Sequence, residues 1–160
     1  MAAKKVYELT QEGVDKLKEE LNDLIDNKRP QNLEMLKEAR AQGDLSENAD
    51  YDAARNEQGR IEARIVEIEG ILKYAKVIKL SDKDIVEIGK LVKIKYLENK
   101  NIFEFQLVGT LEANPMEKKI SVESPIGKAI IGHEIGNQVL VKTPGKNYTV
   151  EILEVKNEVL

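Results

Sequence analysis

Four carboxylates crowd one short segment, Gly43–Asp52, and are the strongest candidates for chemistry in this chain: Asp44, Glu47, Asp50 and Asp52. Asp44 and Glu47 are three residues apart, a spacing that lets both side chains face one side of a turn entering a helix. Two carboxylates are too few to hold Mg²⁺ tightly, because that ion prefers six oxygen ligands and keeps several waters. The pair could instead complete a two-metal site that a partner half-builds, where water is activated for in-line attack on a phosphodiester.

The same acids also have a structural interpretation. Asp44 or Ser46 could cap a helix that begins here, and acids in the first turn of a helix suit its dipole. Short motifs match by chance too often for the residues alone to choose between a cap and a metal-binding role. Tyr51 opens the apolar stripe that follows, which favours packing for its ring.

Arginines follow the flanking helices behind these acids: Arg40, Arg55, Arg60 and Arg64. We expect Arg40 and Arg55 to lie nearest the acids, where a guanidinium could contact an RNA phosphate. On a helix surface, however, arginines more often pair with neighbouring acids such as Glu38 and Glu62, and that is the interpretation the residues favour.

Composition excludes several other kinds of site. The chain has no cysteine, and its lone histidine, His133, cannot build a His-rich metal cluster or a pair of acid/base imidazoles. Lys and Arg number 25 against 29 Asp and Glu, for a formal charge of −4, which argues against a broad basic surface for nucleic acid. No signal peptide, membrane span, phosphate-binding loop or dinucleotide fingerprint is recognisable, so we expect a cytoplasmic protein that carries no bound cofactor of its own.

Helical periodicity dominates the first half of the chain. Thr10 is a good N-cap, and Pro30 predicts a kink or short break in the helix that follows. Apolar residues recur along this first helix at Val14, Leu17, Leu21, Leu24, Ile25, Leu33, Leu36 and Ala39. A second stripe alternates steps of three and four at Tyr51, Ala54, Gln58, Ile61, Ile65, Ile68, Leu72 and Ala75. Two such helices joined by a few residues fold back antiparallel, so residues 1–78 predict a coiled-coil arm of roughly 45 Å that carries the acids at its tip.

The second half changes to the period of β-strands. Alternating segments predict five strands, at Leu91–Tyr96, Phe103–Leu107, Ile120–Val122, Gln138–Val141 and Tyr148–Leu153. Ser124 before Pro125 and Gly132 after the last apolar residue bracket one short helix between the third and fourth strands. Residues 79–160 therefore predict a small antiparallel sheet with one helix, and the chain as a whole is of the α+β class.

These motifs resemble the bacterial Gre family of transcript-cleavage, or transcription elongation, factors. The segment Glu38–Arg55 is similar to the arm tip of that family, and Ile120–Gly132 is similar to its second signature. Lys142–Gly145 fits as well, so the resemblance covers almost the whole chain in the right order.

The resemblance implies an antiparallel coiled coil and an FKBP-like domain that docks, through the loop of Ser124 and Pro125, at the secondary channel of bacterial RNA polymerase. Within that complex, Asp44 and Glu47 would help hold a Mg²⁺ shared with the polymerase, which then cleaves its own backtracked RNA. Arg40 and Arg55 match a small basic patch that contacts the extruded RNA 3′ end. The protein would thus be an accessory factor and no enzyme by itself, with a basic patch closer to the A-type than the B-type factor.

Other functions stay open from the residues. A related protein could occupy the same channel as an inhibitor, although the kept Asp44 and Glu47 pattern argues against that. A coiled-coil adaptor, in which the acids are only caps, would bind another partner, and a freestanding nuclease would need metal ligands that two carboxylates do not supply. The few aromatic residues give no apolar pocket for a prolyl isomerase.

Overall fold

The computed structural model describes residues 6–43 and 48–157 of the chain, which divides into two compact units. One unit contains Glu12–Ala75, and the other contains Tyr7–Gln11 together with the chain from Lys76 onward. Within the described residues, no helix is both long and apolar enough to cross a membrane. The α+β class predicted from the sequence is confirmed, with a helical hairpin followed in the chain by a β-sheet.

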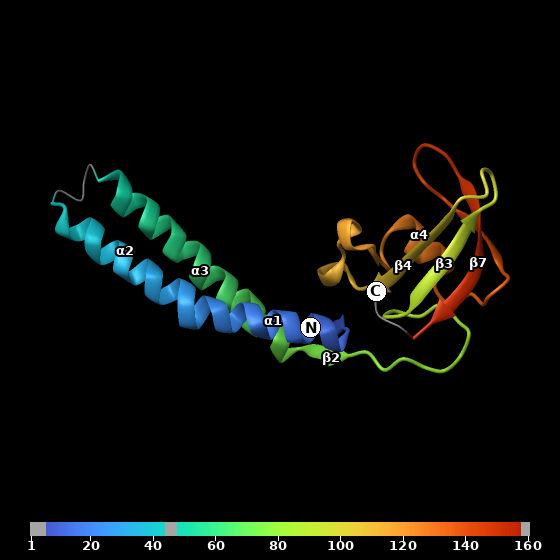
Figure 1. Ribbon diagram of the computed structural model, residues 1–160, viewed down its shortest axis with the longest axis horizontal. Helices are drawn as coiled ribbons and strands as arrows, with labels where there is room; N and C mark the ends of the chain where they lie inside the picture. The colour runs from blue at the N-terminus through green and yellow to red at the C-terminus, as the bar shows by residue number, and fades with distance from the viewer. Residues whose placement is uncertain (1–5, 44–47, 158–160) are drawn as a thin grey trace, which may run out of the picture. The chain divides into compact units, whose positions relative to one another are not determined.

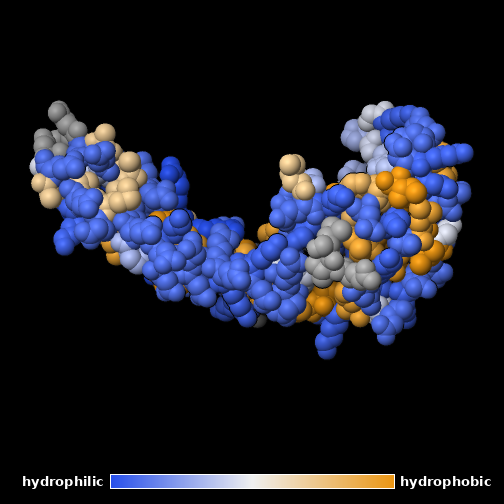
Figure 2. Space-filling view, in the orientation of Figure 1, coloured by the Kyte–Doolittle hydropathy of each residue, from blue (hydrophilic) through white to orange (hydrophobic). Residues whose placement is uncertain are grey.

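The first unit is a hairpin of long helices (Figure 1). Its first limb consists of α1 (Gln11–Asp23), a π-helical turn (Leu24–Lys28) and α2 (Arg29–Ala41), which follow one another without interruption. The second limb is α3 (Ala49–Lys73), which packs along α2. Hydrophilic residues cover most of the face of this hairpin seen in Figure 2, as expected for helices that bury only one stripe.

The π-helical turn takes the place of the kink or break expected at Pro30. The backbone N–H of Arg29 donates to the carbonyl of Leu24, five residues back, and Pro30 then sits in the first turn of α2, where a missing N–H is tolerated. The chain therefore stays helical through the proline. The wider turn also changes which side of α2 faces its partner.

One predicted position of the seam on α2 is wrong. Leu33 was expected in the apolar stripe but is 52% exposed, whereas Asn32 is buried with Leu36 and Ala39. Leu36 and Ala39 are thus confirmed in the stripe, and the buried positions Asn32, Leu36 and Ala39 step by four and three residues, which is coiled-coil spacing. A polar side chain thus occupies a core position of the hairpin.

The predicted stripe on α3 is largely confirmed. Ala54, Ile61, Ile65 and Ile68 of that stripe are buried, and the next buried position is Ile71 where Leu72 was predicted. Burial of each isoleucine contributes about 1.5–3 kcal/mol, so this row supplies most of the attraction between the limbs.

The second unit is built on a five-stranded sheet with the strand order β5-β4-β3-β7-β6, beside a two-stranded sheet of β1 and β2. The strands expected at Leu91–Tyr96 and Gln138–Val141 are confirmed, and β1 was not anticipated from the sequence. The strands are β1 (Tyr7–Leu9), β2 (Ala75–Val77), β3 (Leu91–Tyr96), β4 (Ile102–Val108), β5 (Lys119–Ser121), β6 (Gln138–Val141) and β7 (Tyr148–Lys156).

One strand pairing differs from the all-antiparallel sheet that was expected. β5 runs parallel to β4, because two 3₁₀ turns, Thr110–Glu112 and Pro115–Glu117, carry the chain back along the edge of β4 before it pairs. The remaining pairs are antiparallel. The predicted short helix is present as α4 (Pro125–Ile130), and its Ile130 packs into the core. That core consists of Val86, Val92, Ile94, Phe105, Leu107, Ile130, Val139, Val141, Val150, Ile152 and Val155.

A buried lysine organises the turn that leads into this sheet. The side chain of Lys90 is 1% exposed, and its Nζ donates to the carbonyls of Lys83, at 2.5 Å, and Ile85, at 3.1 Å. The Glu87 carboxylate lies 3.5 Å from the same ammonium and accepts the Ser81 hydroxyl at 2.9 Å. The Ser81 hydroxyl, chiefly, and the ammonium hold the pKa of Glu87 below its usual value. The buried ammonium of Lys90 thus holds together the backbone at Lys83 and Ile85 and the side chain of Glu87.

Candidate functional site

The two principal candidates for chemistry, Asp44 and Glu47, lie outside the described residues. The ends of the hairpin on either side of them are described. Gly43 closes α2 with a φ of +114°, a conformation that glycine adopts without strain. On the other side, Asn48 is the N-cap of α3 in an extended conformation.

The cap of α3 is therefore Asn48, and the expectation that Asp44 or Ser46 caps this helix is wrong. The Oδ1 of Asn48 accepts a hydrogen bond from the backbone N–H of Tyr51 at 3.1 Å, which satisfies one of the free donors at the helix start. Asp50 and Asp52 occupy the first turn, where the helix dipole favours a negative charge. Capping of α3 therefore does not explain why residue 44 is an aspartate.

Asn48 also joins the two limbs of the hairpin. Its Nδ2 donates to the carbonyl oxygen of Ala39 at 2.7 Å. That oxygen belongs to the last turn of α2, where it also accepts the backbone N–H of Gln42 at 3.3 Å. One half-buried side chain thus caps α3 and binds the end of α2.

Arg40 and Tyr51 make a second contact across the hairpin. The guanidinium carbon of Arg40 lies 5.9 Å from the ring centroid of Tyr51, within the range of a cation–π interaction. Tyr51 is half-buried, so the packing predicted for its ring is combined with a contact to a cation. The arginine is held beside the tip without being neutralised.

Farther from the tip, the arginines are paired with acids, as the sequence favours. Arg29 makes a two-pronged pair with Glu62, at 2.8 and 2.9 Å. Arg64 does the same with Glu20, at 2.7 and 2.9 Å, which lowers the pKa of the Glu20 carboxyl, chiefly through the hydrogen bond. Both pairs join one limb to the other. Arg60 pairs within α3 with Glu57 at 2.9 Å.

Arg40 and Arg55 differ from these neighbours. Neither forms an ion pair with any acid among residues 6–43 and 48–157, and both are exposed. An exposed guanidinium that is not paired with a carboxylate is available to bind an anion such as a phosphate. The two arginines expected to lie nearest the acids are thus the two whose charge is not compensated in the described part of the arm.

The segment Ile120–Gly132 contains α4, and two of its residues fix the start of that helix. The hydroxyl of Ser124 accepts from the backbone N–H of Gly127 at 3.1 Å and donates to the carbonyl of Ser121 at 2.6 Å, so Ser124 is the N-cap. A Cβ on Gly127 would lie 2.3 Å from the Ser121 carbonyl oxygen, so only glycine fits there. Pro125 is exposed in the first turn, and the structure leaves its surface open.

Two family models match this chain and together cover nearly all of it. The N-terminal model, "Transcription elongation factor, N-terminal", matches residues 7–77, and "Transcription elongation factor, GreA/GreB, C-term" matches residues 81–157. The chain belongs to the GreA/GreB family of transcription elongation factors. The resemblance drawn from the tip and the second signature is thereby confirmed.

Curated relatives of this GreA/GreB family member are similar over almost their whole length. "Transcription elongation factor GreA" of Acholeplasma laidlawii (strain PG-8A) is 59% identical over 154 residues, which is 95% of this chain and 98% of the relative. The protein of the same description from Mesoplasma florum is 50% identical over 149 residues, covering 92% and 96%. Among solved structures, the GreA factor homolog 1 (Gfh1) protein of Thermus thermophilus is 27% identical, with a TM-score of 0.44 and coverage of 94% and 99%.

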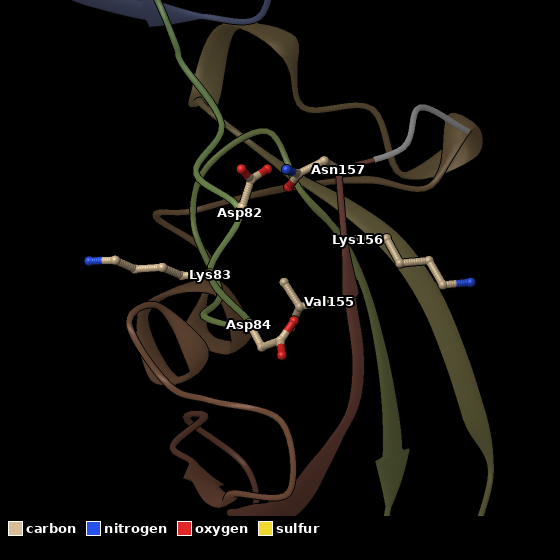
Figure 3. A pocket seen from close by; sticks show the side chains of 6 residues that line it. All are labelled: Asp82, Lys83, Asp84, Val155, Lys156 and Asn157. Carbon is tan, nitrogen blue, oxygen red and sulfur yellow. The ribbon is translucent and has the colours of Figure 1, made fainter.

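The sheet unit of this GreA/GreB chain also has a shallow cavity of about 340 Å³ (Figure 3). It is lined by Asp82, Lys83, Asp84, Val155, Lys156 and Asn157. The stick view shows the side chains of Lys83 and Lys156 directed away from the cavity. Within the described residues, no three side chains of metal-ligating type come together.

Sequence reasoning missed two residues that shape the candidate site of this family member. Asp44, Ser46 and Asn48 are all residue types that cap helices, so residue type alone did not single out Asn48. Asn32 was missed because the predicted stripe placed Leu33 in the seam. Counting back four residues from Leu36 and seven from Ala39 would have placed Asn32 there, since these steps keep the heptad spacing.

Proposed function

We propose that this chain stimulates the intrinsic cleavage of backtracked RNA by bacterial RNA polymerase and so rescues arrested elongation complexes. The observation that carries the proposal is at the end of the hairpin, where Asn48 caps α3, so the capping role that was the alternative for Asp44 is taken by another residue. Membership of the GreA/GreB family supports the same assignment. The chain would act as an accessory factor whose carboxylates complete the active centre of another protein.

In this proposal Asp44 and Glu47 are the residues that would bind Mg²⁺, together with ligands from the polymerase. Their oxygen atoms suit a hard divalent cation, and two carboxylates leave room for the partner's ligands and for water. When bound, the ion would supply a water of lowered pKa for attack on the RNA phosphodiester. The chain contributes the two carboxylates and the rigid support that carries them.

The hairpin has the properties needed to present such carboxylates inside a partner. Its limbs are joined by a buried row of isoleucines and by cross-limb pairs such as Arg64 with Glu20. Arg40 and Arg55, which form no ion pair with the acids of residues 6–43 and 48–157, flank the tip, where they would attract the phosphates of the displaced RNA 3′ end. In the sheet unit, exposed Pro125 at the start of α4 is the residue we assign to docking on the polymerase, with Ser124 shaping its loop.

The test is cleavage of end-labelled RNA in a stalled, backtracked elongation complex with Mg²⁺, with and without this protein. A sample with protein and RNA but no polymerase is the control. Cleavage that requires both the protein and the polymerase would support the proposal. Binding without stimulated cleavage would indicate an inhibitor of the channel, the absence of both would indicate an adaptor, and cleavage without polymerase would indicate a nuclease.

A further inference from the structure

We propose that Asn32 and Asn48 form a reciprocal lock that sets the axial register of α2 against α3 and thereby positions the tip. Asn32 projects from α2 and donates to the carbonyl of Ala54 on α3, at 2.9 Å. Asn48, at the start of α3, donates to the carbonyl of Ala39 on α2, at 2.7 Å. Each limb thus supplies one amide and one carbonyl. The inference rests on the proposed function, because the carboxylates it positions are Asp44 and Glu47.

The need for a lock follows from the chemistry of the seam. Its buried residues near the tip are small or aliphatic, with Leu36 and Ala39 on one limb facing the row of α3 that begins at Ala54. Such surfaces attract one another without specifying one register, whereas a single buried asparagine in a coiled coil is a known device for fixing it. A slide of one residue moves a helix about 1.5 Å along its axis, enough to break a hydrogen bond of this length.

The placement of the two amides suits the tip. Asn32 is 3% exposed and lies on the interior of the hairpin, whereas Asn48 is half-buried at its end. Two bonds separated along the hairpin oppose both sliding and splaying of the limbs. The chain that carries Asp44 and Glu47 leaves α2 after Ala41 and reaches α3 at Asn48, so its two ends are held at a fixed separation.

Two substitutions separate this positioning role from a general contribution to stability. Asn32→Leu places an aliphatic side chain in the seam, so the thermal midpoint should stay the same or rise. Asn48→Ser keeps a hydroxyl that can cap α3 but removes the amide that reaches Ala39. Matched controls are Asn56→Leu on the exposed side of α3 and Asn27→Ser, whose amide bonds to Asp23 in its own limb.

The register can be measured without polymerase. Because the chain has no cysteine, spin labels can be attached through Glu38→Cys and Ala53→Cys, at exposed positions on opposite limbs. We expect one narrow distance distribution in the parent and in both controls. Combining Asn32→Leu with Asn48→Ser should broaden or shift that distribution while the hairpin stays folded. An unchanged distribution would overturn the lock.

Cleavage of backtracked RNA gives the functional half of the test. Misplacement of reacting groups by about 1 Å can cost roughly a hundredfold in rate, so the double variant should lose roughly tenfold to a hundredfold at saturating factor. The concentration that gives half-maximal stimulation should not change, because the docking surface is intact. Full cleavage despite a broadened distribution would overturn the positioning role. If the parent itself fails to stimulate cleavage, the proposed function is wrong, and the spin-label distances alone then support or overturn the lock.

Discussion

Replacing Lys90 by methionine should destabilise the sheet unit by about 2 kcal/mol. The ammonium makes two close hydrogen bonds to backbone carbonyls, and bonds from a charged donor contribute about 1.5–3 kcal/mol each. Methionine fills similar space and avoids the cost of burying an ammonium, which is several kcal/mol and offsets part of that loss. For a unit of this size, about 2 kcal/mol corresponds to a fall in the thermal midpoint of about 8–16 °C.

Thermal unfolding monitored by circular dichroism measures the change in the thermal midpoint that Lys90→Met causes. Hydrogen exchange of backbone amides shows which part of the sheet unit is destabilised. The N–H of Val86 donates to the carbonyl of His133 at 2.8 Å, and the N–H of Gly89 donates to that of Leu107 at 2.6 Å. Both amides should exchange faster in the variant, because the turn loses its internal cation. Lys83→Met, at an exposed position of the same turn, is the control. An unchanged or higher midpoint with unchanged exchange would refute the reasoning.

Three further results are expected. Ile68→Asp should unfold the hairpin in a circular dichroism melt, because it buries a charge at a fully enclosed position; an unchanged melt would contradict the assigned seam. Arg55→Gln should weaken crosslinking of the chain to the displaced RNA 3′ end, whereas Arg60→Gln should not, since that arginine is already paired within α3. Because Arg64 lowers the pKa of Glu20, this pair stabilises the hairpin above about pH 4.3 and is lost as pH falls through the lowered pKa. The melting temperature should therefore fall between pH 7 and pH 3, by less in Glu20→Gln than in the parent; equal falls would show that the pair contributes nothing.

The sequence predicted the helices and strands well, because most of them bury one regular stripe. The strand at Leu91–Tyr96 and the isoleucines of α3 follow simple periods, which local packing preserves. The wrong placement of Leu33 has a different origin, since it follows a π-helical turn, which adds a residue to one turn without any change in composition. No local pattern marks such a turn, although Pro30 shows that the regular helix must be altered nearby.

The pairing of β5 and the presence of β1 could not be predicted for another reason. Both depend on contacts between segments distant in the chain, such as Gln106 with Lys119 in the parallel pair. Alternation predicts that a segment is a strand but not which neighbour it joins. In the candidate site, the acids and arginines were recognisable by type and spacing. Asn48 was not recognisable, because its side chain acts through a hydrogen bond to Ala39 that forms when the two limbs pack together.

The most direct test of the central claim compares two pairs of acids on either side of the same helix start. In a backtracked elongation complex, Asp44→Asn with Glu47→Gln should abolish stimulated RNA cleavage while polymerase binding stays within about twofold. Asp50→Asn with Asp52→Asn removes the same charge from the exposed first turn of α3 and should leave most of the cleavage intact. Cleavage retained by the Asp44 and Glu47 variant, or lost equally in both variants, would contradict the claim that these two carboxylates complete the polymerase's active centre.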